Sequence, residues 1–227
     1  MNSKKRDVVL VGCGGFGTEV ATYLADVMAE QSLVVSDVVD AGAGRFAEIE
    51  HILGESPARH GSYDSIRSVQ KKAFVLCFGD PIVRLREFAK IKALGGQFLT
   101  VVHPRAYIAT TARVCEGTIV APFAFVGPHA VVGANCALNV RATVGHDAVL
   151  GHSVVVSPHV NINGSARCGD CSFLGSGVIL HPGTNVGRYV KIASASVVKF
   201  DVGDGELAAG NPAKGRKMFV VPEGEIH

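Results

Sequence analysis

The chain has 227 residues, of which 48% are hydrophobic and 19% are charged, and its formal net charge is +2. Its basic residues form no stripe of the kind that binds a nucleic-acid backbone. With no tryptophan and only four tyrosines, it also lacks the stacking aromatic side chains of a nucleic-acid-binding surface. No segment approaches the roughly 20 consecutive apolar residues of a membrane span. The apolar stretch behind the basic N-terminus is too short and too rich in glycine for a signal peptide, so we expect a cytoplasmic protein.

The first hundred residues predict a small α/β lobe. A short apolar run, residues 8–11, ends in the glycine-rich turn of residues 12–17, and a helical pattern follows through residue 28. A strand, a glycine turn and a helix begin a nucleotide-binding βαβ unit, in which glycines let the backbone approach a phosphate at the helix N-terminus. The same turn is also compatible with simple packing in a small α/β lobe.

The rest of the lobe continues this alternation. A second strand, residues 33–39, ends at Asp40, about where such folds place an acid on a ribose hydroxyl. Strands are expected at residues 73–78 and 98–102, with a helix at 82–94 between them, and the segment 41–61 is expected to contain a surface loop. The lobe is too small for the second half of an NAD-dependent oxidoreductase, and a nucleotide diphosphate with a sugar attached fits it better.

The second half of the chain is a hexapeptide repeat. Every sixth residue from Ile108 to Val198 is aliphatic, except for Cys168. This period predicts a solenoid of short parallel strands, three per triangular coil, with the aliphatic residue inside. We therefore expect a Rossmann-like half lobe in residues 1–102, a left-handed parallel β-helix in residues 103–216, and a tail of unassigned role in residues 217–227.

One pair of cysteines, Cys168 and Cys171, has the spacing of a zinc or redox motif. The repeat argues against both, because Cys168 takes an interior position and Cys171 falls elsewhere on the coil. We expect buried cysteines that act as small hydrophobic residues, and we expect no metal.

Among the histidines of the repeat, His146 is the candidate general base. Hexapeptide solenoids are mostly acyltransferases, and acyl transfer needs one base, for which histidine with its reference pKa of about 6.5 is suited. Asp147 beside it could fix the tautomer of the ring and raise its basicity. Gly164 lies one coil after His146 and would leave room for a thioester. A carbonic anhydrase-like zinc site is disfavoured, because that family has two histidines five residues apart and the residue five after His146 is Gly151.

Taken together, these motifs resemble the bacterial nucleotide-sugar N-acetyltransferases of the bacillosamine, sialic-acid-cluster and perosamine type. The resemblance rests on the glycine-rich lobe, on His103-Pro104-Arg105-Ala106, on Gly145-His146-Asp147 within unbroken hexapeptides, and on the ending Gly210-Asn211-Pro212-Ala213-Lys214. It covers residues 8 to 217.

The resemblance implies an acetyl-CoA-dependent N-acetyltransferase that acts on a nucleotide-linked amino sugar, a 4-amino-4,6-dideoxy sugar. It implies that His146 takes the amine proton, that Asp147 holds and polarises His146, and that Asn139 lies near the sugar. The turn residues Gly14, Gly15 and Phe16 would hold the nucleotide diphosphate, with Asp40 near the base or ribose. In a homotrimer, acetyl-CoA would lie in the groove between subunits, held by backbone amides around Val155, Gly164, Ser176 and Ser194.

This chain departs from the family at two of those positions: Phe16 and Val155 stand where relatives carry histidine. Two alternatives stay open beside the N-acetyltransferase. One is a sugar O-acetyltransferase, and the other is a non-catalytic trimeric scaffold that binds a nucleotide. The identity of the nucleotide base and the position of the amine on the sugar are left open.

Overall fold

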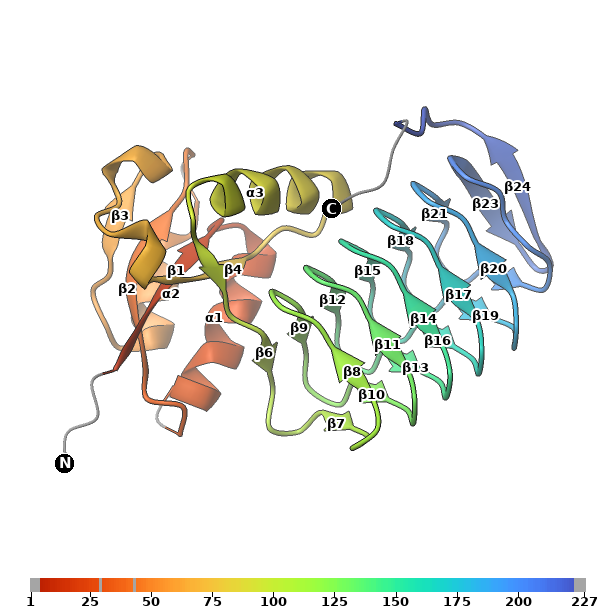
Figure 1. Cartoon of the computed structure of the whole chain (residues 1–227), viewed down its shortest axis with the longest axis horizontal. Helices are drawn as coiled ribbons and strands as arrows, with labels where there is room; N and C mark the ends of the chain where they lie inside the picture. The colour runs from red at the N-terminus through yellow and green to blue at the C-terminus, as the bar shows by residue number, and fades with distance from the viewer. Residues whose placement is uncertain (1–4, 29, 43, 223–227) are drawn as a thin grey trace.

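The computed structural model describes residues 5–28, 30–42 and 44–222. An N-terminal lobe of helices around a sheet packs against one end of a long β-helix, whose coils stack away from it (Figure 1). In the part of the chain so described, no helix has the length and apolar character needed to cross a bilayer.

The lobe is built on a parallel five-stranded sheet with the order β3-β2-β1-β4-β5. The central strand β1 (Arg6–Val11) is apolar and fully buried over Val8 to Leu10, as expected for a parallel strand covered on both faces. The other strands are β2 (Leu33–Val39), β3 (Ala58–His60), β4 (Ala73–Leu76) and β5 (Gln97–Phe98). The helices are α1 (Gly15–Met28), α2 (Phe46–Leu53) and α3 (Pro81–Ala93), with 3₁₀ turns η1 (Tyr63–Ser65) and η2 (Val69–Lys71).

The structure refines two expectations for the lobe. The segment 41–61 contains more than a loop, because it holds both α2 and β3. Its two buried helical residues, Ile49 and Leu53, are too few to give a clear period. The strand expected at 98–102 is divided between two sheets: β5 pairs with β4, whereas β6 (Val101–Val102) pairs with the β-helix strand β9. The chain crosses from the lobe to the β-helix within these few residues.

From β6 to β22 the β-helix consists of two-residue strands in three sheets of parallel strands, and strands that pair lie eighteen residues apart, as Phe125 pairs with Thr143. The six-stranded sheet contains β7 (Tyr107–Ile108), β10 (Phe125–Val126), β13 (Thr143–Val144), β16 (Asn161–Ile162), β19 (Ile179–Leu180) and β22 (Val197–Val198). The five-stranded sheet of the β-helix contains β8 (Arg113–Val114), β11 (Val131–Val132), β14 (Val149–Leu150), β17 (Arg167–Cys168) and β20 (Asn185–Val186).

The eight-stranded sheet faces the N-terminal lobe at its first strands. It contains β6, β9 (Ile119–Val120), β12 (Ala137–Leu138), β15 (Val155–Val156), β18 (Phe173–Leu174), β21 (Lys191–Ile192), β23 (Glu206–Gly210) and β24 (Ala213–Lys217). The last two strands form an antiparallel hairpin that ends the stack.

The inward residues of the coils form one continuous core, as the repeat predicts. Val126 pairs with Val144, which pairs with Ile162, and all are at most 1% exposed. Cys168 takes its place in this core, and Cys171 is buried in a different turn. Both are free thiols, in agreement with the prediction that they are small core residues.

The three edges of the β-helix differ in chemistry and are named here by their residues. The asparagine edge joins the eight- to the six-stranded sheet and contains Asn139, Ser176 and Ser194. The histidine edge joins the six- to the five-stranded sheet and contains His146 and Gly164. The aspartate edge joins the five- to the eight-stranded sheet and contains His152, Asp170, Arg188 and Asp204.

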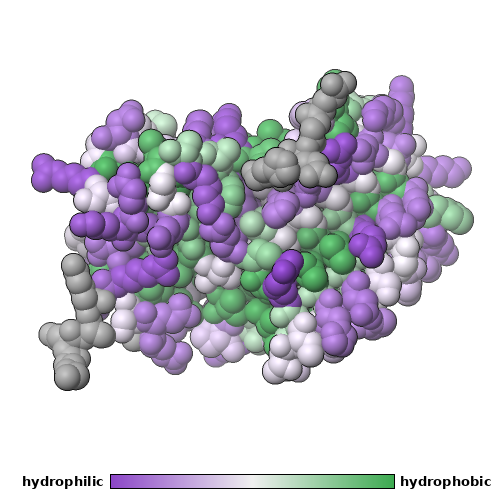
Figure 2. Space-filling view, viewed as in Figure 1, coloured by the Kyte–Doolittle hydropathy of each residue, from purple (hydrophilic) through white to green (hydrophobic). Residues whose placement is uncertain are grey.

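A buried arginine fastens the lobe to the coils. Arg84 of α3 is 0% exposed and donates hydrogen bonds to five carbonyl oxygens, those of Leu76 and Phe78 in the lobe and of Gly117, Asn135 and Cys136 in the coils. At the other side, His103 Nε2 lies 2.9 Å from Asp26 Oδ2 of α1. On the face seen in Figure 2, hydrophilic side chains gather over the lobe and hydrophobic ones reach the surface over the coils.

Candidate active site

The predicted base and its acid are neighbours in one turn of the histidine edge. His146 and Asp147 connect β13 to β14, and the Nδ1 atom of His146 lies 2.8 Å from Oδ2 of Asp147. Both side chains are exposed, at 67% and 55%. A neutral ring that donates Nδ1–H to the carboxylate keeps Nε2 as the proton acceptor. The geometry is therefore that of a base whose tautomer is fixed and whose Nε2 atom can accept a proton.

Gly164 makes room for this ring. A β-carbon on Gly164 would overlap Nε2 of His146 and would lie 2.6 Å from Cε1. The ring thus lies directly over the backbone of the next coil. The glycine expected to leave room for a thioester leaves room first of all for the base itself.

Backbone amides are available on two of the three edges. On the aspartate edge they are used internally: Asp170 Oδ1 accepts from His152 N, and Asp204 Oδ1 accepts from Arg188 N at 2.8 Å. In contrast, the N–H groups of Gly164, Ser176 and Ser194 donate to no atom of the described residues. The histidine and asparagine edges can therefore offer amide donors to a ligand.

Val155 is placed differently from the other three predicted cofactor residues. It lies on the eight-stranded sheet, is 2% exposed, and its N–H donates to Ser172 O at 3.0 Å. Neither its side chain nor its amide is free to contact a ligand in this chain. Periodicity located Val155 on a coil but gave no information about what covers that face.

Asn139 lies on the asparagine edge with its amide nitrogen already engaged. Its Nδ2 donates to Val156 O of the next coil at 2.9 Å. This bond orients the side chain and leaves its Oδ1 without a donor among the described residues. Val140, the next residue, packs against the same apolar cluster as Phe16 of α1. The edge that carries Asn139 thus packs, through Val140, against the apolar cluster of the lobe.

In the glycine-rich turn, sterics divide the glycines into two kinds. A β-carbon on Gly12 would lie 2.9 Å from the Phe78 ring, and one on Gly17 would overlap the carbonyl of Gly12. Gly14 and Gly15, in contrast, have open space around them and are exposed. Gly12 and Gly17 are required by packing, whereas Gly14 and Gly15 leave the N-terminus of α1 open to an anion.

Asp40 supports this turn. Its Oδ1 accepts from Cys13 N, and its Oδ2 accepts from Gly42 N and Gly44 N, each at 3.3 Å. The carboxylate at the end of β2 therefore ties the glycine turn to the loop that follows β2. Asp40 follows directly after β2, as the sequence predicts. In this structure its carboxylate oxygens accept hydrogen bonds from backbone N–H groups rather than point freely into solvent.

A cavity of about 420 Å³ opens beside this turn, at the carboxyl ends of β1 and β2. Its wall includes polar side chains that the sequence did not single out, namely Tyr63, Arg86, Glu87 and Lys90. Tyr63 donates its hydroxyl to Glu87 Oε2 at 2.8 Å. Burial would raise the pKa of Glu87, but hydrogen bonds from Lys90, Tyr63 and Arg86 hold it below its usual value. No pattern in the sequence marks these residues as a group, because η1 and α3 are separate in the chain and come together only in the fold.

The predicted residues thus form three groups in one chain. His146, Asp147 and Gly164 share the histidine edge, and Asn139, Ser176 and Ser194 share the asparagine edge. Gly14, Gly15 and Phe16 lie at the start of α1 and do not line the lobe cavity, whereas Asp40 does. The width of the six-stranded sheet separates the first two groups. Among the described residues, no group of three or more histidine, cysteine or acidic side chains could hold a metal ion.

Comparison with known proteins gives a clear result at the level of structure. No family model and no curated protein matches the chain by sequence. The acetyltransferase domain of PglB from Neisseria gonorrhoeae, solved with acetyl coenzyme A, superimposes with a TM-score of 0.82 at 26% identity, covering 93% of this chain and 100% of that one. PerB from Caulobacter crescentus, solved with CoA and GDP-perosamine, gives 0.81 at 26% identity, covering 92% and 97%.

The chain is an acyltransferase. The resemblance to the nucleotide amino-sugar N-acetyltransferases, inferred from the glycine turn, the Gly-His-Asp turn and the C-terminal motif, is confirmed by these solved structures. WeeI from Acinetobacter baumannii shares the fold, with a TM-score of 0.80 at 21% identity over 93% of this chain. These matches cover 92% to 93% of this chain, so they include both the N-terminal lobe and the hexapeptide-repeat half.

Proposed function

We propose that this acyltransferase moves the acetyl group of acetyl-CoA to the amine of a nucleotide-linked amino sugar, with His146 as the general base. The observation that carries the proposal is the turn in which Asp147 fixes the ring of His146 directly over Gly164. The solved structures support the reaction class, because one similar protein holds acetyl-CoA and another holds CoA with GDP-perosamine. The favoured acceptor is a 4-amino-4,6-dideoxy sugar.

The proposed reaction is direct transfer in a ternary complex. The neutral amine attacks the thioester carbon, and Nε2 of His146 takes the proton that the nitrogen loses. The C–S bond then breaks, the carbonyl re-forms, and the proton passes to the departing thiolate. We propose that the N–H of Gly164, which donates to no atom of the described residues, donates to the oxyanion. Base catalysis contributes a factor of roughly 10²–10⁴, and positioning of amine and thioester contributes the rest.

We propose further that the two halves of the chain have the separate roles that the sequence predicts, nucleotide binding and acyl transfer. Residues 1–102 form a Rossmann-like lobe that binds the nucleotide at Gly14, Gly15, Phe16 and Asp40. Residues 103–216 form the acyltransferase β-helix. The amides of Ser176 and Ser194 lie on the asparagine edge, away from His146, so a site that uses both edges is completed by a second copy in a homotrimer. Val155 contributes to cofactor binding only if a partner or a ligand changes its surroundings.

The test is thiol release from acetyl-CoA with UDP-, dTDP- and GDP-linked 3- and 4-amino sugars as acceptors, for wild-type and His146→Ala protein. Turnover on one amine acceptor that is lost in the variant establishes the reaction and the base. Turnover only on hydroxyl acceptors would replace the proposal with an O-acetyltransferase. Acetyl-CoA binding without turnover on any acceptor would indicate a non-catalytic scaffold.

A further inference from the structure

A basic hollow of about 490 Å³ lies in the lobe, at the opposite end of the strands from the lobe cavity. Arg6 begins β1 and lines the hollow, whereas Val11 ends β1 and lines the lobe cavity. At about 3.3 Å per residue, the length of this strand separates the two. The hollow is therefore distinct from the residues to which chemistry is assigned.

The wall of this hollow is rich in positive charge. Lysine and arginine make up 22 of the 227 residues of the chain but five of the seven residues that line the hollow, namely Lys5, Arg6, Arg67, Lys71 and Lys72. The other two are Ser68 and Asp7, and the Asp7 carboxylate forms no ion pair with a described residue. The cations come from two segments that are distant in the sequence, so only the fold gathers them.

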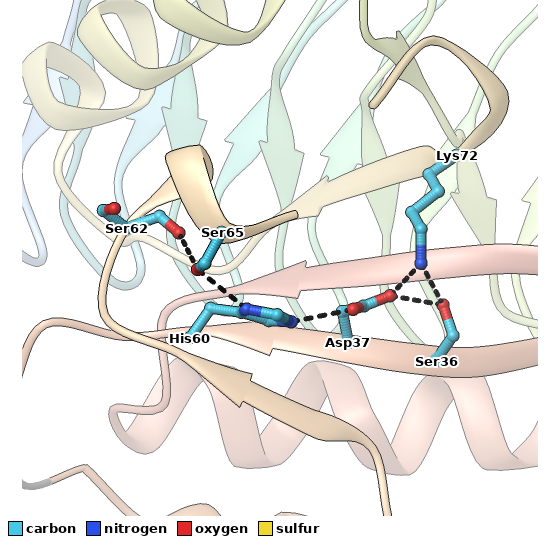
Figure 3. Close-up of polar contacts among 6 residues, drawn as sticks. All are labelled: Ser36, Asp37, His60, Ser62, Ser65 and Lys72. Carbon is cyan, nitrogen blue, oxygen red and sulfur yellow. Dashed lines mark hydrogen bonds and ion pairs between the residues drawn. The ribbon is translucent and has the colours of Figure 1, made fainter. Parts of the chain in front are cut away.

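One of the five cations is neutralised within the lobe. The ammonium of Lys72 donates to the Asp37 carboxylate and, at 3.1 Å, to Ser36 Oγ (Figure 3). Asp37 is 6% exposed, and its Oδ1 atom lies 2.8 Å from Nε2 of His60. The charge of Lys72 is therefore balanced by a buried carboxylate, and the side chain is held in place.

The other cations are not neutralised in this way. Lys5 Nζ lies 4.0 Å from Glu55 Oε1, at the outer limit of an ion pair. Arg6, Arg67 and Lys71 are exposed, and their side chains have no hydrogen bond or ion pair with any residue in the described part of the chain. Within the described ranges, three unpaired cations therefore line one hollow.

The backbone that carries two of these cations is fixed. Lys71 N donates to Ser68 O at 2.9 Å and closes the 3₁₀ turn η2, which follows Arg67. Val69 in this turn is 9% exposed, and Lys72, directly after it, is held by the ion pair described above. Arg67 and Lys71 thus project from an anchored turn, so less ordering is needed when a ligand binds.

We propose that this basic hollow binds the phosphate groups of an anionic ligand, at a site separate from the proposed active site. Arg6, Arg67 and Lys71 exceed the one acid in the wall, Asp7, by two positive charges, and like charges around one hollow repel until an anion balances them. A guanidinium binds two phosphate oxygens at once, and an ammonium binds another. Donors from two separate elements suit the tetrahedral oxygens of phosphate better than the coplanar oxygens of a carboxylate.

Two sources carry this chemistry, a free ligand with a diphosphate group and the headgroups of an anionic phospholipid surface. The volume of the hollow lies within the range of small-ligand pockets, roughly 300–1,000 Å³, and its exposed position leaves it open to a surface. The inference does not depend on the proposed function, because no residue of the hollow is assigned to acetyl transfer.

The first test is calorimetric titration of inorganic diphosphate at low ionic strength, where exposed charges are least screened. The variants are Arg67→Gln and Lys71→Gln, and the matched control is Arg216→Gln, which removes an exposed charge from β24. We expect the wild type to bind and each hollow variant to bind about fivefold more weakly, the loss of one hydrogen bond. An equal loss in Arg216→Gln would show attraction by net charge alone and would overturn the site.

Thermal melting provides a second readout. Because Arg67 and Lys71 have no partner among the described residues, the melting temperatures of the two hollow variants without diphosphate should equal or exceed that of the wild type. Diphosphate should raise the melting temperature of the wild type more than that of either variant, since a ligand stabilises the state that binds it. The same rise in all proteins would contradict the inference.

The source of the phosphate is identified by sedimentation with vesicles of phosphatidylcholine alone and of a roughly 3:1 mixture with phosphatidylglycerol, which gives an anionic surface. Retention on the mixed vesicles only, lost in Arg67→Gln, identifies the phospholipid headgroup. Diphosphate binding without retention identifies a free ligand, and binding of neither probe by the wild type overturns the proposal. Thiol release should be equal in wild type and Arg67→Gln, so a lack of turnover counts against the proposed function alone.

Discussion

The ring of His146 lies in the space that a side chain on Gly164 would need. An alanine at Gly164 would therefore displace the ring, because rotating an exposed imidazole costs less than moving the backbone of a packed coil. We expect Gly164→Ala to lower kcat by about tenfold or more, since small displacements of a catalytic group are costly. The measurement is steady-state thiol release. Ser165→Ala, which changes the neighbouring exposed residue, should retain the wild-type kcat.

We expect removal of the proposed base to have a larger effect. His146→Ala should lower kcat by at least about a hundredfold, the lower end of the range for general base catalysis. Asp147→Asn keeps the ring but loses the charge beside Nδ1, so we expect an intermediate loss. Light scattering should show the same oligomeric state for the wild type, His146→Ala and Asp147→Asn. A near-wild-type kcat in His146→Ala would remove this residue from its role.

Proline tests the amide donors without disturbing the fold. Pro158 stands one coil before Ser176 at the same position of the asparagine edge, so this position accepts the ring. Ser176→Pro removes the free N–H, and we expect the KM for acetyl-CoA to rise about fivefold, the worth of one hydrogen bond. Ser176→Ala keeps the N–H and serves as the control. Equal KM values for the two variants would exclude this amide as a cofactor donor.

Arg84 is expected to matter for stability rather than chemistry. Burial lowers its pKa to about 10, so the group stays charged at neutral pH, with carbonyl oxygens as its partners. Arg84→Met leaves those carbonyls without their donor, and we expect a loss of about 2–4 kcal/mol in the free energy of unfolding. Urea denaturation measures it. Arg86→Met, on the exposed side of the same helix, should change stability by less than about 0.5 kcal/mol.

The buried carboxylate of Asp37 in β2 is expected to make the stability of the lobe sensitive to acid. Burial would raise the pKa of Asp37, but hydrogen bonds from Lys72, Ser36 and His60 hold it below its usual value. A carboxyl with a lower pKa in the folded state contributes stability that is present above about pH 4 and is lost as pH falls below it. Asp37→Asn should be less stable at neutral pH and should lose less stability on acidification. Denaturation curves between neutral and acid pH compare the two proteins.

The sequence was most informative where structure is local. The hexapeptide period specified which residue of each strand faces the core, and His146 and Asp147 are adjacent in the chain. The coil length placed Gly164 beside them. The contacts of Arg84 could not be predicted, because its partners lie up to 52 residues away along the chain.

The hydrogen bond between His60 and Asp37 could not be predicted for the same reason. His60 reaches Asp37 because β3 pairs with β2 in the register that sets His60 opposite Val39. Nothing in either segment alone specifies that register. Val155 shows a different limit, since an outward position in a coil is exposed or buried according to what packs on that face.

The constant coil length also determines where the chain can tolerate insertions and deletions. Pairing strands are eighteen residues apart, so one inserted residue would turn the inward aliphatic side chains of that coil towards solvent. The β-helix can therefore diverge only by substitution or by gain and loss of whole coils, which preserves the geometry around His146. Freedom to vary in length is left to the loops of the lobe, after β2 and around η1. If the lobe binds the acceptor as proposed, new acceptor preferences can arise there while the proposed acetyl-transfer site stays the same.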